Sequence, residues 1–148
     1  EGGIQSMLDD AAMAVMTLNG GSAVPLWNTW LDGLQEEAPE GEEIDVAGLK
    51  AIFAKALEEL EDMSGAKVGD KTMMDALIPA SEAVAAYTGD SADELFDAAA
   101  QAAAQGAEAT KQYVSKFGRA KSYGTKTIGT PDAGAVSMSC FFQGLARE

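Results

Sequence analysis

Residues 91–117 read SADELFDAAAQAAAQGAEATKQYVSKF, and this alanine-rich stretch indicates the fold class. Alanine has the highest intrinsic helix propensity, and its small side chain lets neighbouring helices approach closely. Ser91 and Glu94, three residues later, form a capping box, which is a signal for the first turn of a helix. We therefore expect one long helix from Ser91 to Phe117, packed closely against other helices.

Apolar residues recur at helical spacing along most of the remaining chain, and glycine, proline or acidic linkers interrupt them. Asp70 is placed to cap the helix that follows it, and Pro79 to kink that helix. No segment alternates strand-forming residues with a period of two, so the sequence predicts an all-α fold. The further helices are expected over residues 4–18, 26–34, 46–63, 73–87 and 135–146, which gives about six helices in this segment.

The length of 148 residues suits one domain with a single core, and the hydrophobic content of 47% excludes a disordered chain. No run of 18 apolar residues is present, which speaks against a membrane span. Glu1-Gly2-Gly3 contains neither an initiator methionine nor the start of a secretory signal. We expect residues 1–148 to be a single cytoplasmic domain whose N-terminal part is incomplete.

The side-chain inventory excludes several classes of function. The chain has no histidine, which removes Ser-His-Asp and Cys-His catalysis and histidine-ligated zinc. The single cysteine, Cys140, lies in an apolar run and is expected to be a buried small hydrophobe in a reducing compartment. A net charge of −14 disfavours nucleic acid and anionic lipid as partners, because like charges repel.

Two glycine-rich segments precede helices at positions where an anion could bind. Residues 19–25, NGGSAVP, free backbone N–H groups beside a helix N-terminus, whose partial positive charge favours phosphate. Residues 64–77, SGAKVGDKTMMDAL, also lead into a helix and carry Lys67 and Lys71, although the spacing is not that of a Walker A motif. Each segment alone fits an ordinary turn or a capped helix at least as well.

A third segment, residues 117–135, reads FGRAKSYGTKTIGTPDAGA and combines glycine, hydroxyl and basic side chains. Its loop, residues 118–134, is longer than a bare connection needs, and such loops are usually functional or disordered. In so acidic a chain, local positive charge suits a polyphosphate. A mobile loop whose cations balance the acidic surface explains the pattern equally well. Five of the ten basic residues of the chain fall here or just upstream: Lys111, Lys116, Arg119, Lys121 and Lys126.

Taken in order, the three segments resemble the DhaL family, the nucleotide-binding subunit or domain of dihydroxyacetone kinases. Residues 20–23 look like its phosphate loop, and residues 69–77, GDKTMMDAL, are the most specific match. Residues 118–120 and 127–135 look like its arginine loop and the turn that follows. The resemblance covers essentially the whole chain. It implies an antiparallel helical barrel of eight helices, of which this segment supplies about six.

The resemblance also implies roles for individual residues. Arg119 is the expected catalytic residue, because it would stabilise charge on the phosphates. The expected nucleotide-binding residues are Gly20, Gly21, Ser22 and Ala23 at the phosphates, Ser64, Gly65, Thr72 and Met73 beside the adenine, and Arg119, Asp132, Ala133 and Gly134 in the loop and turn that close over the nucleotide.

Some positions depart from the family pattern. Val24 stands where the family usually has glycine, and Ala133 stands where it has proline. The family holds magnesium with spaced aspartates in a Gly-Asp-x-Asp-x-Gly motif that is absent here, and Asp9 and Asp10 suit the solvent face of a helix instead. We expect no metal ligand in this segment and no kinase activity from it in isolation. Helices that carry the motif should exist in the same or a separate polypeptide, since an apolar strip would otherwise stay exposed.

The implied function is a kinase that transfers a phosphoryl group to dihydroxyacetone (glycerone) or a similar ketose, with ADP or ATP and magnesium as cofactors. A partner subunit or domain would bind the ketose through a histidine, which agrees with the absence of histidine here. The phosphoryl donor is open, since exchangeable ATP and a resident ADP recharged by a phosphotransfer protein both fit. The ketose and a homodimeric state are open as well. The alternatives are a non-catalytic helical paralogue with a binding or regulatory role and, with a poorer arginine-loop match, a fatty-acid kinase nucleotide domain.

Overall fold

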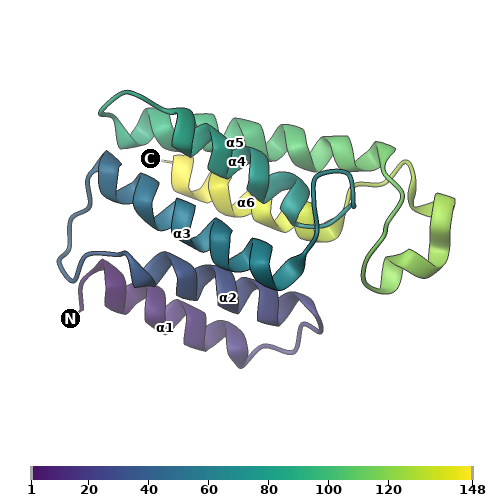
Figure 1. Ribbon diagram of the computed structural model, residues 1–148, viewed down its shortest axis with the longest axis horizontal. Coiled ribbons are helices and arrows are strands. Elements are labelled where there is room, and N and C mark those ends of the chain that lie inside the picture. The colour runs from purple at the N-terminus through teal and green to yellow at the C-terminus, as the bar shows by residue number, and fades with distance from the viewer. Residues whose placement is uncertain (1, 148) are drawn as a thin grey trace. The chain divides into compact units, whose positions relative to one another are not determined.

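The computed structural model describes residues 2–147, and this part of the chain is all-α, as the sequence predicted (Figure 1). The helices follow one another through short loops, except for the longer segment between α5 and α6. Two short 3-10 helices, η1 and η2, lie in that segment. The elements are α1 (Ile4–Met16), α2 (Ala23–Glu36), α3 (Val46–Ser64), α4 (Met74–Ala86), α5 (Ala92–Ala109), η1 (Thr110–Gln112), η2 (Arg119–Thr127) and α6 (Ala133–Ala146).

The contacts between residues divide the chain into two compact units, Glu1–Gly65 and Ala66–Glu148. Unit 1 contains α1 to α3, and unit 2 contains α4 to α6 with both 3-10 helices. The expected single domain and the expected barrel depend on how these units are arranged, so both stay predictions. Among the described residues, no helix is both long and apolar enough to cross a membrane.

In unit 1, α2 packs against both α1 and α3. Gly33 permits the close approach of α2 to α3, since a Cβ at this position would lie 2.8 Å from the Cα of Ala56. Trp30 is buried and packs edge-on against Trp27, with 5.8 Å between the ring centroids. The ring of Phe53 on α3 lies 6.1 Å from that of Trp30. Aromatic packing therefore holds α2 against α3, and the glycine at position 33 allows the two helices to come this close.

The helix α1 is attached to the rest of unit 1 at its start. The N–H of Ile4 donates to the carbonyl of Gly41 at 2.8 Å, which ties α1 to the acidic linker after α2. Ala12 is the buried residue of this helix. Apolar surface is exposed along α1 and just after it, at Met7, Met13, Met16 and Leu18.

In unit 2, α5 packs against both α4 and α6, and α4 also contacts α6. The buried stripe of α5 consists of residues four apart in sequence, which lie on one face of a helix. Its members are Leu95, Ala99, Ala103 and Ala107. Since three of the four are alanine, α5 can come close to its neighbours, as the alanine-rich sequence predicted.

Gly106 and Pro79 together set the closest approach of α5 to α4. Pro79 lies inside α4 and has no N–H, so the carbonyl of Asp75, four residues earlier, cannot form its usual helical hydrogen bond. This carbonyl faces Gly106, where a Cβ would collide with the carbonyl oxygen and lie 3.0 Å from the carbonyl carbon. A Cα–H group can lie against such an oxygen, whereas a side chain cannot. The glycine in an alanine-rich helix is therefore a packing requirement.

The helix α5 is shorter than the sequence predicted. It ends at Ala109, one turn of 3-10 helix follows, and Tyr113 is already extended with ψ 149°. The carbonyl of Thr110 accepts the N–H of Tyr113 at 3.1 Å, a 3-10 hydrogen bond, and also a hydrogen bond from Lys71 Nζ at 2.9 Å. The expected continuation to Phe117 is wrong, because the chain tightens into a 3-10 turn at the carbonyl that a distant residue also binds.

The segment expected to lack regular structure contains η2, which is kinked at Gly124 (φ 54°, ψ −131°). The expected burial of Cys140 is also wrong, because this side chain is exposed. The buried face of α6 follows a spacing of three and four residues, and Cys140 lies off it. That face is formed by Ala135, Met138, Ser139 and Phe142.

Replacing Gly106 with alanine tests the close approach of α4 and α5. We expect Gly106→Ala to lower the free energy of unfolding by about 1–3 kcal/mol, the range for overpacking, although alanine is the better helix former. Urea denaturation followed by circular dichroism measures the change. Gly144→Ala on α6 is the matched control, because a Cβ there meets no atom within 4 Å. It should be neutral or stabilising, and equal losses for both variants would contradict the packing described.

Candidate functional site

Asp75, a buried carboxylate in the first turn of α4, organises the loop ahead of that helix. Its Oδ1 accepts the N–H of Gly69 at 2.7 Å, and its Oδ2 accepts the N–H of Thr72 at 2.8 Å. The helix begins at Met74, too far along the chain for Asp70 to cap it. The predicted N-cap is therefore wrong, because Asp75 reaches back and satisfies the loop N–H groups itself.

Asp70 joins this loop to the segment after η1. Its carboxylate accepts the N–H of Lys67 at 2.9 Å and forms an ion pair with Lys116 Nζ at 3.0 Å. The backbone N–H of Lys116 also donates to the carbonyl of Asp70 at 3.1 Å. The hydrogen bond from the Lys67 N–H, and then the contact with Lys116, lower the pKa of Asp70.

Lys71 connects the same loop to both ends of residues 110–130, which carry the cations of η2 and are called the cationic segment below. It is 4% exposed, and its φ of 61° is the one positive φ at a non-glycine position among the described residues. Its Nζ donates to the carbonyls of Thr110 at 2.9 Å, Thr127 at 2.5 Å and Thr130 at 2.5 Å. An ammonium has three N–H donors, so all of them are used.

The hydroxyl groups of two buried threonines complete this junction. Thr110 Oγ1 accepts the N–H of Asp132 at 2.8 Å, which places the start of α6 at the end of α5. Thr127 Oγ1 accepts the N–H of Ser115 at 3.0 Å, which joins the two ends of the cationic segment. Each hydroxyl therefore satisfies a backbone N–H that the loops would otherwise leave without a partner.

The sequence indicated no role for three residues of this junction, Asp75, Thr110 and Thr127. It indicated Lys71 as a cation beside a possible anion site, whereas its ammonium is buried against three carbonyls. The available signal was the position of Lys71 and Asp75, two opposite charges on either side of the apolar pair Met73-Met74. Charged groups at such a place must find polar partners if they are buried. A capped helix whose charges are exposed to solvent fits the same residues, so the sequence alone does not distinguish buried from exposed charges at these positions.

The predicted turn Asp132–Gly134 lies against the predicted residue Met73 within unit 2. A Cβ at Gly134 would lie 3.3 Å from the Cβ of Met73 and 3.4 Å from its backbone nitrogen. Asp132 caps α6 by accepting the N–H of Ala135 at 2.9 Å. Burial raises the pKa of Asp132 above its ordinary value, and the charge of Asp75 adds to this effect.

Arg119 begins η2, and its side chain is exposed, as are those of Lys121 and Lys126. Within residues 2–147, no ion pair joins these three cations to an acid. Lys111, by contrast, pairs with Glu108 at 2.6 Å. The positive charge that an anion could use therefore lies on η2.

The remaining predicted residues belong to unit 1. Residues 20–23 link α1 to α2, and Gly21 has a φ of 64°, which favours glycine. The helix α2 begins at Ala23 without a side-chain cap. In its first turn the N–H of Val24 donates to the carbonyl of Gly21 at 3.3 Å and Pro25 has no N–H, so neither position offers an N–H to an external acceptor. Ser64 ends α3, and Gly65 follows as its left-handed cap with φ 64°.

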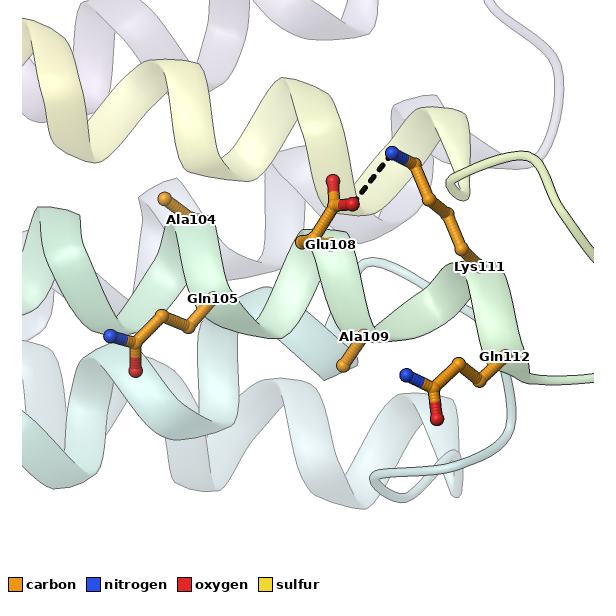
Figure 2. Close-up of a pocket in the computed structure, with 6 residues that line it drawn as sticks. All are labelled: Ala104, Gln105, Glu108, Ala109, Lys111 and Gln112. Carbon is orange, nitrogen blue, oxygen red and sulfur yellow. Dashed lines mark hydrogen bonds and ion pairs between the residues drawn. The ribbon is translucent and has the colours of Figure 1, made fainter.

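A hollow of about 500 Å³ lies along the end of α5 (Figure 2). Glu108 and Lys111 pair with each other at its edge, and Gln105 and Gln112 also line it. None of the predicted nucleotide-binding residues belongs to its lining. We assign it no role in binding.

The carboxylates of the described residues do not fit a magnesium site. Between residues 2 and 147, no three acidic, cysteine or histidine side chains gather so that they could hold a metal ion. Asp9 and Asp10 are exposed on α1, as expected for a solvent face. Both oxygens of the buried Asp75 already accept backbone N–H groups.

Comparisons with known proteins add independent information. Residues 1–147 match the family model described as the DAK2 domain. The chain is 35% identical to the L-erythrulose kinase of Pectobacterium atrosepticum over 99% of its own length and 25% of that kinase. It is 31% identical to the dihydroxyacetone kinase of Pichia angusta over 90% of its own length and 23% of that kinase. It is 30% identical to the ADP-binding subunit DhaL of the PEP-dependent dihydroxyacetone kinase 1 of Listeria innocua over 93% of its own length and 64% of that subunit. The chain thus spans about a quarter of the two long kinases and less than two thirds of the DhaL subunit.

The lowered pKa of Asp70 predicts a pH-dependent contribution to stability. A lowered carboxyl pKa stabilises the fold above the unfolded value of about 4, and this contribution is lost as the pH falls further. Asp70→Asn should therefore be less stable than the wild type at pH 7, and the difference should shrink below about pH 4. Urea denaturation of both proteins across this range measures the difference.

The partner of Asp70 supplies the control. Lys116→Met removes the ion pair but keeps the hydrogen bond from the Lys67 N–H, which has the largest lowering effect on the pKa of Asp70. It should therefore reproduce only part of the pH-dependent difference. Stability curves of wild type and Asp70→Asn that run parallel from pH 7 to pH 3 would refute this role of Asp70.

Proposed function

The chain belongs to the family of DAK2 (DhaL) domains of dihydroxyacetone and erythrulose kinases, and on this basis we propose that it is the nucleotide-binding part of such a kinase. The resemblance read from the motifs is thereby confirmed. The proposed reaction is phosphoryl transfer to a hydroxyl group of a small ketose, dihydroxyacetone or erythrulose.

One observation carries the proposal: three predicted segments of the site converge on a single junction in unit 2. The loop with Thr72 and Met73, the turn Asp132–Gly134 and the base of the segment with Arg119 are joined through Lys71. Residues that act on one ligand must lie close together, and a distance of 59 positions along the chain separates Lys71 from Thr130. The convergence therefore supports a common role for the three segments.

The charge distribution supports a polyphosphate as the ligand. The chain carries a net charge of −14, yet Arg119, Lys121 and Lys126 are exposed together on η2. Phosphate oxygens bind most strongly to charged donors, and arginine can donate two parallel hydrogen bonds to them. In the proposed site, Arg119 stabilises the negative charge that moves between the phosphates during transfer. Phosphoryl transfer depends mainly on such positioning and charge stabilisation.

The other predicted residues complete the proposed site. Residues 20–23 donate backbone N–H groups to the phosphates, since no side chain caps the start of α2. Ser64, Gly65, Thr72 and Met73 border the adenine, and the turn Asp132–Gly134 closes over the nucleotide. Magnesium, which the family chemistry implies, would be held by carboxylates other than those described, since these form no cage. This chain contributes binding, orientation and charge stabilisation.

The ketose is proposed to bind elsewhere, on a partner subunit or domain. The name of the Listeria relative describes an ADP-binding subunit, which implies a kinase with several subunits. The present chain has no histidine that could anchor a ketose carbonyl. ATP and a phosphotransfer protein acting on resident ADP are both compatible donors, and a cytoplasmic location suits either.

Arg119→Ala tests the proposed phosphate contact. Loss of a charge-assisted hydrogen bond should weaken ADP binding by about 1.5–3 kcal/mol, a factor of roughly 10 to 150. Isothermal titration of the complete kinase subunit with ADP measures this directly. Because Arg119 is exposed, the unfolding free energy should change by less than about 0.5 kcal/mol.

Arg147→Ala provides the matched control, since Arg147 is the second arginine of the chain and is also exposed. It should leave ADP affinity unchanged while altering the net charge by the same amount. Equal affinities of wild type, Arg119→Ala and Arg147→Ala would eliminate the role proposed for Arg119. Equal losses in both variants would indicate a general charge effect instead.

A further inference from the structure

Lys71 combines two unfavourable features in one residue. Its backbone has a positive φ of 61°, a conformation that glycine or asparagine adopts far more readily than lysine. Its side chain carries a charge into a place that is 4% exposed, where an ammonium needs complete compensation. Neither feature is explained by capping or packing of α4. An explanation must come from what the ammonium contacts.

The three carbonyls around Lys71 Nζ belong to distant parts of unit 2. Thr110 lies at the end of α5, Thr127 ends η2, and Thr130 lies in the turn before α6. Residues 110–130 therefore form a closed segment: the carbonyl at its start and two carbonyls at its end bind the same ammonium. The exposed cations of η2 lie in this closed segment. Its base is therefore held by one side chain.

The loop that presents Lys71 is itself fixed from both sides. Asp75 accepts the N–H of Gly69, two residues before Lys71, and the N–H of Thr72, the residue after it. The charge of the Lys71 ammonium lowers the pKa of Asp132, against the larger effect of burial, which raises it. The ammonium thus has three carbonyl oxygens as direct partners and acts on the carboxyl at the start of α6.

We propose that Lys71 is a positioning residue for nucleotide binding: its ammonium closes the base of residues 110–130 and thereby places Arg119 and the turn at Asp132. This inference rests on the proposed nucleotide-binding function. Lys71 does not touch the nucleotide, because its three N–H donors are all used by protein carbonyls. It acts on affinity only through the segment that it closes.

The first test uses trypsin on the complete kinase subunit without nucleotide. Lys71→Met removes the ammonium and keeps the side-chain length, whereas Lys71→Gly also relieves the positive φ. Both should be cut after Arg119, Lys121 and Lys126 at least about tenfold faster than wild type, since three charge-assisted hydrogen bonds are lost. Lys67→Met, an exposed lysine of the same loop, is the control and should match the wild type.

Chemical rescue separates the ammonium from a general loss of structure. Lys71→Gly leaves a channel into which n-butylammonium can place an ammonium with its alkyl stem. We expect ADP affinity to fall about tenfold in the Lys71→Gly variant. The n-butylammonium cation should restore both this affinity and trypsin resistance. Tetramethylammonium has no N–H and should restore neither. A role limited to overall stability predicts faster cleavage throughout the chain and no rescue by either cation, which would overturn the proposal.

A double-mutant cycle separates positioning from direct contact with the nucleotide. If Lys71 acts through Arg119, Lys71→Met should weaken ADP binding less in the Arg119→Ala background than in the wild type. If the losses of ADP affinity in the two single variants add fully in the double variant, and trypsin cleavage between positions 119 and 126 is unchanged, Lys71 contacts the nucleotide directly. That result would refute the inference. If the wild type binds no ADP, the proposed function fails, and the trypsin rates alone decide whether Lys71 closes the segment.

Discussion

The fold of unit 2 depends on where one buried ammonium finds its hydrogen bonds. Lys71 Nζ takes the carbonyls of Thr110, Thr127 and Thr130, and with them it fixes the end of α5, the end of η2 and the turn before α6. The free energy needed to bury an ammonium without these partners is far larger than the free-energy difference between loop conformations. The surrounding loops are therefore arranged to supply carbonyl oxygens, and the left-handed backbone of Lys71 follows from the same requirement.

The position of those carbonyls depends in turn on how closely α5 approaches α4. Gly106 lies against the carbonyl of Asp75, which Pro79 has left without a helical partner. Thr110 lies one helical turn beyond Gly106, on the same side of α5. A wider spacing of the helices would move the carbonyl of Thr110 away from the loop that holds Lys71. Small residues far from any ligand thus set the geometry of the candidate site.

Most helix boundaries could be predicted from the sequence because they depend on neighbours within a few positions. The periods of apolar residues gave α1, α2, α3 and α6 to within about three residues, and the alanine-rich stretch gave the start of α5. The end of α5 could not be predicted, since the carbonyl of Thr110 at this point also binds Lys71, 39 positions away. Asp70 was predicted as the cap, whereas Asp75 accepts the loop N–H groups, because only the folded loop decides which carboxylate reaches which N–H. For the site, the motifs indicated Arg119, Met73 and the turn at Asp132, but not the buried groups that join them.

Nucleotide is proposed to bind where these segments converge, and hydrogen exchange in the complete kinase subunit tests this most directly. Amide exchange measured by mass spectrometry with and without ADP reports each segment separately. We expect ADP to slow exchange in residues 66–73 and 118–134, while residues 4–16 of α1 stay unchanged. Protection confined to other parts of the chain, with these two segments exchanging equally fast in both states, would contradict it.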